Sequence, residues 1–171
     1  SIPFVGLHAH SVAGSVFDGF GYPQDHMDFA YENGMSALAL TDHGNMNGMS
    51  YQVLHAKKMK KQGKDFKPIF GVEAYFVASI EDWKAEYDRV KEDKKQARKV
   101  INDTDKVETE DEGASKSKSN KINSSGHLVL VAMNQTGLNN IFKIVSDSHQ
   151  GDNFYRKPRL DYKLLKEYGD G

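Results

Sequence analysis

The chain has 171 residues, of which 38% are hydrophobic and 27% charged, and its formal net charge is −1 at pH 7. This length fits one domain, or a large piece of one, with enough apolar residues for a core. A net charge near zero excludes a surface that attracts nucleic acid everywhere, so such contacts must use a local patch. The absence of cysteine excludes disulfides, thiolate metal sites and a thiol nucleophile. No apolar run approaches the roughly 20 residues that span a bilayer, and we expect a cytoplasmic protein without membrane contact.

The first 78 residues alternate between apolar runs and helical patterns. One helix is predicted to begin near Pro23 and to stop at Gly34, because proline suits a first turn and glycine a C-terminal stop. A second helix is predicted to run to about Gln62, before Gly63. Near-continuous apolar strands separated by helices favour a parallel sheet covered by helices, the α/β class. The predicted strands are residues 4–7, 37–40 and 68–77.

Residues 79–126 form a charged segment that we interpret as an insertion, with 11 Lys or Arg and 12 Asp or Glu. Trp83, Tyr87 and Val90 have the spacing i, i+4, i+7, which predicts an exposed helix. Residues 102–125 lack any periodicity and favour a flexible, partly disordered loop. We expect a surface insertion; the alternative is a lysine-bearing arm that contacts a phosphate backbone.

The chain becomes apolar again after the insertion. Residues 127–132 predict a buried strand, and apolar positions at helical spacing within 138–145 predict a helix after it. A last short helix is predicted at 162–168. We therefore expect residues 1–171 to belong to one α/β domain.

Histidines and acids gather at the ends of the predicted strands. His8 and His10 are two residues apart at the end of the first run, and both rings project from one face because side chains alternate along a strand. His43, beside Asp42, follows the second strand. Sites in parallel α/β folds gather where strands end, so we expect these three imidazoles to point toward one rim.

Glu73 is unusual because it lies inside an apolar strand, between Val72 and Ala74. A buried carboxylate is costly unless a cation or hydrogen-bond donors contact it. Asp18, in the glycine-rich loop after the first two histidines, is a further candidate oxygen ligand. His127, at the start of the fourth strand, is a further candidate nitrogen ligand.

Imidazoles and carboxylates without sulfur suit Zn²⁺, Mn²⁺ or Fe²⁺. The candidates exceed what one tetrahedral ion needs, so we expect two or three ions that share carboxylates. Such clusters activate water and clamp a phosphate during its displacement, and we therefore hypothesise a multi-metal phosphoester hydrolase. Taken singly, each histidine could be structural and Asp18 could cap a turn. The candidate ligands are His8, His10, Asp18, His43, Glu73 and His127.

Four stretches of sequence resemble motifs of the PHP (polymerase and histidinol phosphatase) superfamily. They are residues 7–11 (LHAHS), 17–19 (FDG), 40–45 (LTDHGN) and 68–75 (PIFGVEAY). The pattern covers nearly the whole chain outside the charged segment. His-x-His alone would be unspecific, but the four motifs together are specific.

Two later stretches of sequence indicate a particular branch of this superfamily. Residues 127–138 and 154–159 are similar to the N-terminal PHP domains of the bacterial DNA polymerase III alpha-subunit family. The resemblance implies a distorted seven-stranded β/α barrel, of which this chain would be a C-terminally incomplete part. It also implies further ligands, a cysteine and an Asp-x-His pair, beyond Gly171.

The resemblance further implies a trinuclear metal site and metal-dependent 3′→5′ exonuclease proofreading on a single-stranded DNA 3′ end. Glu73, His10 and His43 are then the expected catalytic residues, and Glu73 bridges two ions. Apart from the resemblance, Lys157 and Arg159 are candidates for a phosphate contact, and the alternative for both is an ordinary surface role. The implied partners are DNA and other domains or subunits of a replicase. The alternatives are a non-catalytic structural module of the replicase and a free-standing phosphatase that acts on a small phosphomonoester.

Overall fold

The computed structural model describes residues 4–103 and 125–171. The flexible loop predicted for residues 102–125 falls almost entirely on residues outside this description. In the described parts, helices and strands combine into a mixed α/β fold around one sheet.

A five-stranded sheet forms the centre of the molecule. β1 (Ala37–Leu40) pairs in parallel with the first half of β2 (Lys67–Phe76). β5 (Lys157–Leu160) pairs in parallel with the end of β2. β3 (Gly126–Val131) runs antiparallel to β2, and the short β4 (Phe154–Tyr155) runs antiparallel to β5. Within the described residues these strands form an open sheet and do not close into a barrel.

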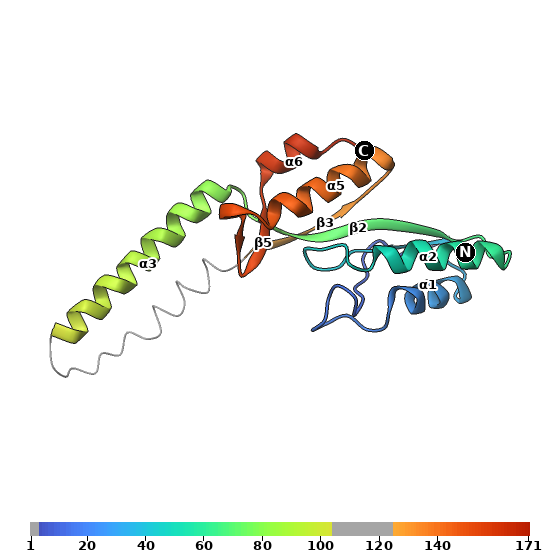
Figure 1. Ribbon diagram of the computed structural model, residues 1–171, viewed down its shortest axis with the longest axis horizontal. Helices are drawn as coiled ribbons and strands as arrows, with labels where there is room; N and C mark the ends of the chain where they lie inside the picture. The colour runs from blue at the N-terminus through green and yellow to red at the C-terminus, as the bar shows by residue number, and fades with distance from the viewer. Residues whose placement is uncertain (1–3, 104–124) are drawn as a thin grey trace.

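The expected parallel pairing is confirmed for β1, β2 and β5, whereas β3 departs from it and runs antiparallel to β2. Gly126 lies opposite Phe76, where β2 ends, and Val131 lies opposite Gly71. The chain therefore re-enters beside the end of β2 and runs back along it. A parallel strand would need a crossover that carries the chain back over one face of the sheet. Instead α3 (Ile80–Asp103), the helix predicted at the start of the charged segment, leads away from the sheet (Figure 1).

The first predicted strand forms only a bridge, between Gly6 and Leu38. The backbone N–H of Ala39 donates to Gly6 (2.8 Å), and that of Thr41 donates to Ala9 (2.8 Å). The segment therefore lies along β1 and ends beside the end of that strand.

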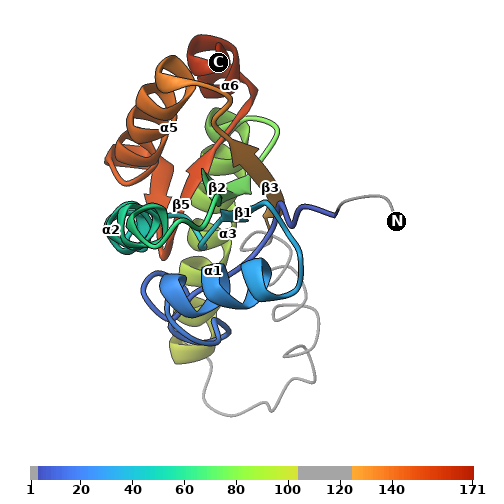
Figure 2. The ribbon, with the colours of Figure 1, turned by 90° about the vertical axis from the view of Figure 1, so that its right-hand side faces the viewer.

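Helices cover both sides of the sheet (Figures 1 and 2). α1 (Pro23–Glu32) lies on one side, and α5 (Gln135–Ser148) and α6 (Tyr162–Tyr168) lie on the other. α2 (Met49–Lys61) packs against both α1 and β2. A single 3₁₀ turn, η1 (Gly151–Asn153), precedes β4. Among the described residues, no helix combines the length and apolar character needed to cross a membrane.

The predicted helix ends are confirmed. α1 begins at Pro23, and Gly34 after it has φ +82°. α2 ends at Lys61, and Gly63 after it has φ +75°. Both glycines adopt the left-handed conformation that commonly follows a helix.

The core consists of two apolar clusters, one on each side of the sheet. Because apolar contacts fix the strands from both faces, the loops at their ends start from well-defined positions. The first cluster contains Met27, Ala30, Leu38, Met59 and Phe66. The second contains Ala74, Ile144 and Leu160.

Candidate metal centre

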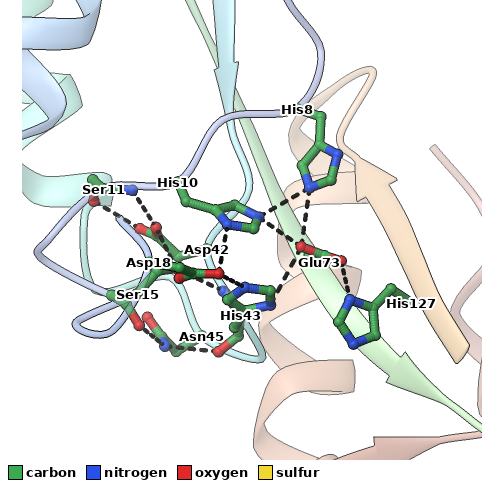
Figure 3. Close-up of polar contacts among 11 residues, drawn as sticks. His8, His10, Ser11, Ser15, Asp18, Asp42, His43, Asn45, Glu73 and His127 are labelled. Atoms are coloured by element: carbon green, nitrogen blue, oxygen red, sulfur yellow. Dashed lines mark hydrogen bonds and ion pairs between the residues drawn. The ribbon is translucent and has the colours of Figure 1, made fainter. Parts of the chain in front are cut away.

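Neighbouring segments of the chain deliver the candidate ligands to one place (Figure 3). The segment along β1 supplies two histidines, the loop after it an aspartate, the turn after β1 a histidine, and β2 and β3 one residue each. The structure brings together all six residues singled out in the sequence. They are His8, His10, Asp18, His43, Glu73 and His127.

Strand register explains why three of these side chains meet. His127 on β3 lies directly opposite Tyr75 on β2, so the two side chains share a face. Glu73 lies two residues before Tyr75 and therefore projects from that same face. His43 forms a parallel bridge with Glu73, whose backbone N–H donates to the carbonyl of Asp42 (3.0 Å).

The Glu73 carboxylate is the centre of the cluster and is only 3% exposed. Its Oε2 lies 2.9 Å from His8 Nε2 and 2.6 Å from His10 Nε2. The same oxygen lies 3.3 Å from His43 Nδ1. Its Oε1 lies 2.5 Å from His127 Nδ1. Four imidazoles therefore surround one buried carboxylate.

Asp18 supplies a second carboxylate on the outer side of the cluster. Its Oδ2 lies 2.7 Å from His43 Nε2 and 3.5 Å from His10 Nδ1. His10 and His43 thus present one ring nitrogen to Asp18 and the other to Glu73 (Figure 3).

Electrostatics keep both carboxylates ionised. Burial raises the pKa of Glu73, but the hydrogen bond with His8 and the charges of His43 and His127 outweigh this effect and lower the pKa below its usual value. The hydrogen bond with His43 lowers the pKa of Asp18. Two anionic groups are therefore available to divalent cations at neutral pH.

The donor atoms lie close enough together to share divalent cations. A cation that nitrogen and oxygen ligands bind at about 2.1 Å separates neighbouring ligand atoms by about 3.0–3.4 Å. His8 Nε2 and His10 Nε2 are 2.9 Å apart and lie 2.9 and 2.6 Å from Glu73 Oε2, so these three atoms are slightly closer to one another than around a bound cation. The buried Nδ1 of His43 has no hydrogen-bond partner, although it lies 3.3 Å from Glu73. An unpaired buried nitrogen is costly, and a cation would satisfy it.

The six residues form three overlapping groups, and the donor atoms of each group lie within 4.8 Å of one another. A neutral imidazole has one free lone pair, so His10 and His43 can each bind one ion at a time. Since each of these two histidines is shared by two groups, the three groups cannot all bind an ion with every one of their ligands while the histidines are neutral. The groups are His8, His10 and Glu73; His10, Asp18 and His43; and His43, Glu73 and His127.

A second layer of polar residues holds the loop that carries Asp18. Asp42 is 1% exposed and accepts hydrogen bonds from the backbone N–H and hydroxyl of Ser11 and from the hydroxyl of Ser15. The Ser15 oxygen also accepts the backbone N–H of His43 (3.1 Å). Sequence reasoning missed both serines. The available signal was Asp42 itself, since a buried carboxylate needs donors and the nearest hydroxyls follow His10.

Asn45 is a further residue that sequence reasoning missed. Its side-chain amide donates to the carbonyls of Gly14 (2.8 Å) and His43 (2.9 Å), and so ties the Asp18 loop to the end of β1. Its place in the motif at residues 40–45 was the only signal in the sequence.

The structure corrects the expectation that Arg159 contacts phosphate. Its side chain is 1% exposed, and Nη1 donates to the carbonyls of Tyr155 and Lys157. The guanidinium lies 4.1 Å from the centre of the Trp83 ring. A guanidinium buried in this way cannot reach an external phosphate.

Lys157 lies beside the cluster. Its Nζ is 4.6 Å from the centre of the Tyr75 ring, which stacks on His43 with an interplanar angle of 15°. Burial and the charges of Glu73 and Asp18 raise the pKa of Tyr75, so its hydroxyl stays protonated. A positive charge therefore lies next to the histidines, separated from them by a neutral ring.

Comparison with known proteins identifies the family. The sequence model of the PHP domain matches residues 6–171, and the chain belongs to the PHP domain family.

Curated relatives include DNA polymerase III alpha subunits. The protein of Aquifex aeolicus is 34% identical over 168 residues, and that of Borreliella burgdorferi is 32% identical over 168 residues. Both alignments cover 98% of this chain, which spans only 12% and 11% of the two relatives. Among solved structures, a protein of Bifidobacterium adolescentis, described provisionally as a metal-dependent phosphoesterase, aligns with a TM-score of 0.44 and 13% identity, over 99% of this chain and 65% of that one.

Proposed function

We propose that this chain binds two or three divalent cations and hydrolyses phosphodiesters, as a 3′→5′ exonuclease acting on single-stranded DNA. The observation that carries this proposal is the convergence of four imidazoles on the buried carboxylate of Glu73. Such a donor set without sulfur suits Zn²⁺, Mn²⁺ or Fe²⁺.

The residues have distinct roles in this proposal. Bound cations supply an activated water molecule and offset the charge of the phosphate. Glu73 can serve two cations, because its two oxygens face different histidines: His8 and His10 on one side, His127 on the other. Glu73, His10 and His43 are the proposed catalytic residues, with Asp18 at the exposed side of the site completing the ligand set.

Lys157 is the proposed phosphate contact among the side chains outside the ligand set. Its ammonium group is held against the Tyr75 ring, one ring away from His43. In this position it can pair with a phosphate oxygen that approaches the histidines, which favours anionic substrates.

The relatives support DNA as the substrate, because they are DNA polymerase III alpha subunits. We therefore propose that the chain works in the cytoplasm beside other domains or subunits of a replicase. The open sheet would then be one portion of the distorted seven-stranded β/α barrel. Residues 79–126 would be a surface insertion in that domain.

The experiment is Mn²⁺-dependent release of nucleotides from a single-stranded 3′ end, measured for the full chain and for His10→Ala. Loss of a ligand should reduce the rate at least about 100-fold, because loss of a residue that only orients a ligand already costs about 10-fold to 100-fold. The matched control is His55→Ala, which removes an imidazole paired with Asp28 instead of Glu73. Equal rates in His10→Ala and the unmodified chain would contradict the proposal. Hydrolysis of small phosphomonoesters with DNA left intact would favour a phosphatase instead.

A further inference from the structure

Exposed aromatic side chains flank Asp18. Phe17 is fully exposed (104%) and Phe20 is 89% exposed, and Val16 beside them is 75% exposed. Neighbouring Cα atoms lie about 3.8 Å apart, so both rings start within two residues of a candidate metal ligand. Large apolar side chains gathered at one exposed place commonly mark a binding surface.

The loop that carries these rings is anchored by hydrogen bonds. The backbone N–H of Val12 donates to Gly21 (3.0 Å), which closes the loop, and that of Gly19 donates to Ser15 (2.6 Å). The Ser15 hydroxyl is bonded to buried Asp42.

Gly19 shows how closely this loop packs. A Cβ at that position would lie 2.4 Å from the backbone carbonyl of Ser11, so the backbone segments at Ser11 and Gly19 are in close contact. The polar inner side of the loop is thus fixed, and the phenyl rings are left on the outside.

We propose that Phe17 and Phe20 form a stacking platform for the bases at the 3′ end of single-stranded DNA. This inference rests on the proposed function. It assigns a binding site to the bases of the substrate, whereas the metal centre would contact the phosphate. Aromatic rings stack on any nucleobase, and each stacked base contributes about 5-fold to 150-fold in affinity. A strand whose terminal phosphate lies beside Asp18 has its last bases within reach of these rings.

The test is equilibrium binding, read by fluorescence anisotropy, of two short fluorescein-labelled oligothymidylates. One strand has normal bases, and the other has abasic residues at its last two 3′ positions. Binding is measured with Ca²⁺ in place of Mn²⁺, so that Mn²⁺-dependent hydrolysis does not consume the strands, and a denaturing gel verifies that they stay intact. The assay reads binding and not cleavage. The stacking proposal can therefore be wrong while the proposed hydrolysis is right, and the reverse also holds.

The variants are Phe17→Ala, Phe20→Ala and the double variant. Since both side chains are almost fully exposed, their removal leaves the fold intact. The dissociation constant for the normal strand should rise at least about 5-fold in the single variants, while that for the abasic strand should stay unchanged. Phe17→Trp keeps an aromatic ring at this position and should bind the normal strand as tightly as the unmodified chain. The control is Phe29→Ala, which removes a 65% exposed ring from α1 and should change neither constant.

Three results would overturn the proposal. Unchanged binding of the normal strand would mean that the rings do not contact DNA and serve a protein interface. An equal loss on both strands would mean that the loop contacts the backbone. The same loss in Phe29→Ala would mean that any exposed ring contributes.

Discussion

Asp42 and Ser15 are joined by a hydrogen bond of 2.8 Å, and Ser15 in turn accepts the backbone N–H of His43. The buried carboxylate thereby fixes the base of the loop that carries Asp18. His43, the residue after Asp42, projects toward Glu73 instead. The end of β1 therefore supplies a candidate metal ligand, His43, and also Asp42, which holds the Asp18 loop in place.

Asp42→Asn is expected to destabilise the fold and the metal centre together. The amide cannot accept three hydrogen bonds as the carboxylate does, and the loss should be about 1–3 kcal/mol in the free energy of unfolding. Affinity for Mn²⁺ should fall about 10-fold to 100-fold. Urea unfolding and metal titration measure the two effects. Asp28→Asn, which breaks the partly exposed pair with His55, should cost less than about 1 kcal/mol, and an equal cost would contradict the role of Asp42.

Gly44 is expected to tolerate a side chain less well than Gly34. Both have positive φ, +67° and +82°, so alanine costs about 1–2 kcal/mol at either position. A Cβ at Gly44 would also lie 2.7 Å from Pro158, whereas nothing lies within 4 Å at Gly34. Gly44→Ala should therefore lose at least about 1 kcal/mol more than Gly34→Ala in thermal or urea unfolding. Equal losses would show that the contact with Pro158 is not tight.

Arg159→Ala should destabilise the fold and shift tryptophan fluorescence. Trp83 is the only tryptophan, and the guanidinium covers its ring. Loss of this contact and of two hydrogen bonds should cost about 2–4 kcal/mol. Emission should move to longer wavelength because water reaches the indole. Arg89→Ala, at an exposed pair with Glu86, is the control; the same spectrum in both variants would contradict the burial of Arg159.

Tyr168 on α6 forms a hydrogen bond with Asp147 on α5. This bond raises the pKa of the Tyr168 hydroxyl to about 12. A raised pKa in the folded state stabilises the fold fully below the unfolded value near 10, and this stabilisation is lost as pH rises from 10 toward 12. Absorbance titration should show one late-titrating phenol fewer in Tyr168→Phe than in the unmodified chain. Identical titration curves would contradict the hydrogen bond.

The local sequence predicted most helices and strands and the convergence of the six candidate ligands. Pro23 and Gly34 bound the first helix, and the strand predicted at 68–77 corresponds to β2. His8 and His10 lie two residues apart, which in an extended segment places both rings on one face, and Glu73 was recognised by its position inside an apolar strand. These features need no knowledge of distant contacts.

Other features depend on tertiary structure and could not be predicted. The direction of β3 depends on where the chain returns after α3, which no local pattern records. Hydroxyls in loops are common, so Ser15 became significant only once buried Asp42 lay beside it. Arg159 looked like a surface charge, but Trp83 covers it.

The most direct test is the metal content of the purified chain after equilibration with Mn²⁺ or Zn²⁺ and removal of free ions, measured by plasma mass spectrometry. At least one bound ion per chain is expected, with a marked loss in Glu73→Gln because this variant removes the charge at the centre of the cluster. Asp28→Asn should match the unmodified chain. Fewer than one ion per chain in the presence of excess metal, or equal content in Glu73→Gln, would contradict the central claim.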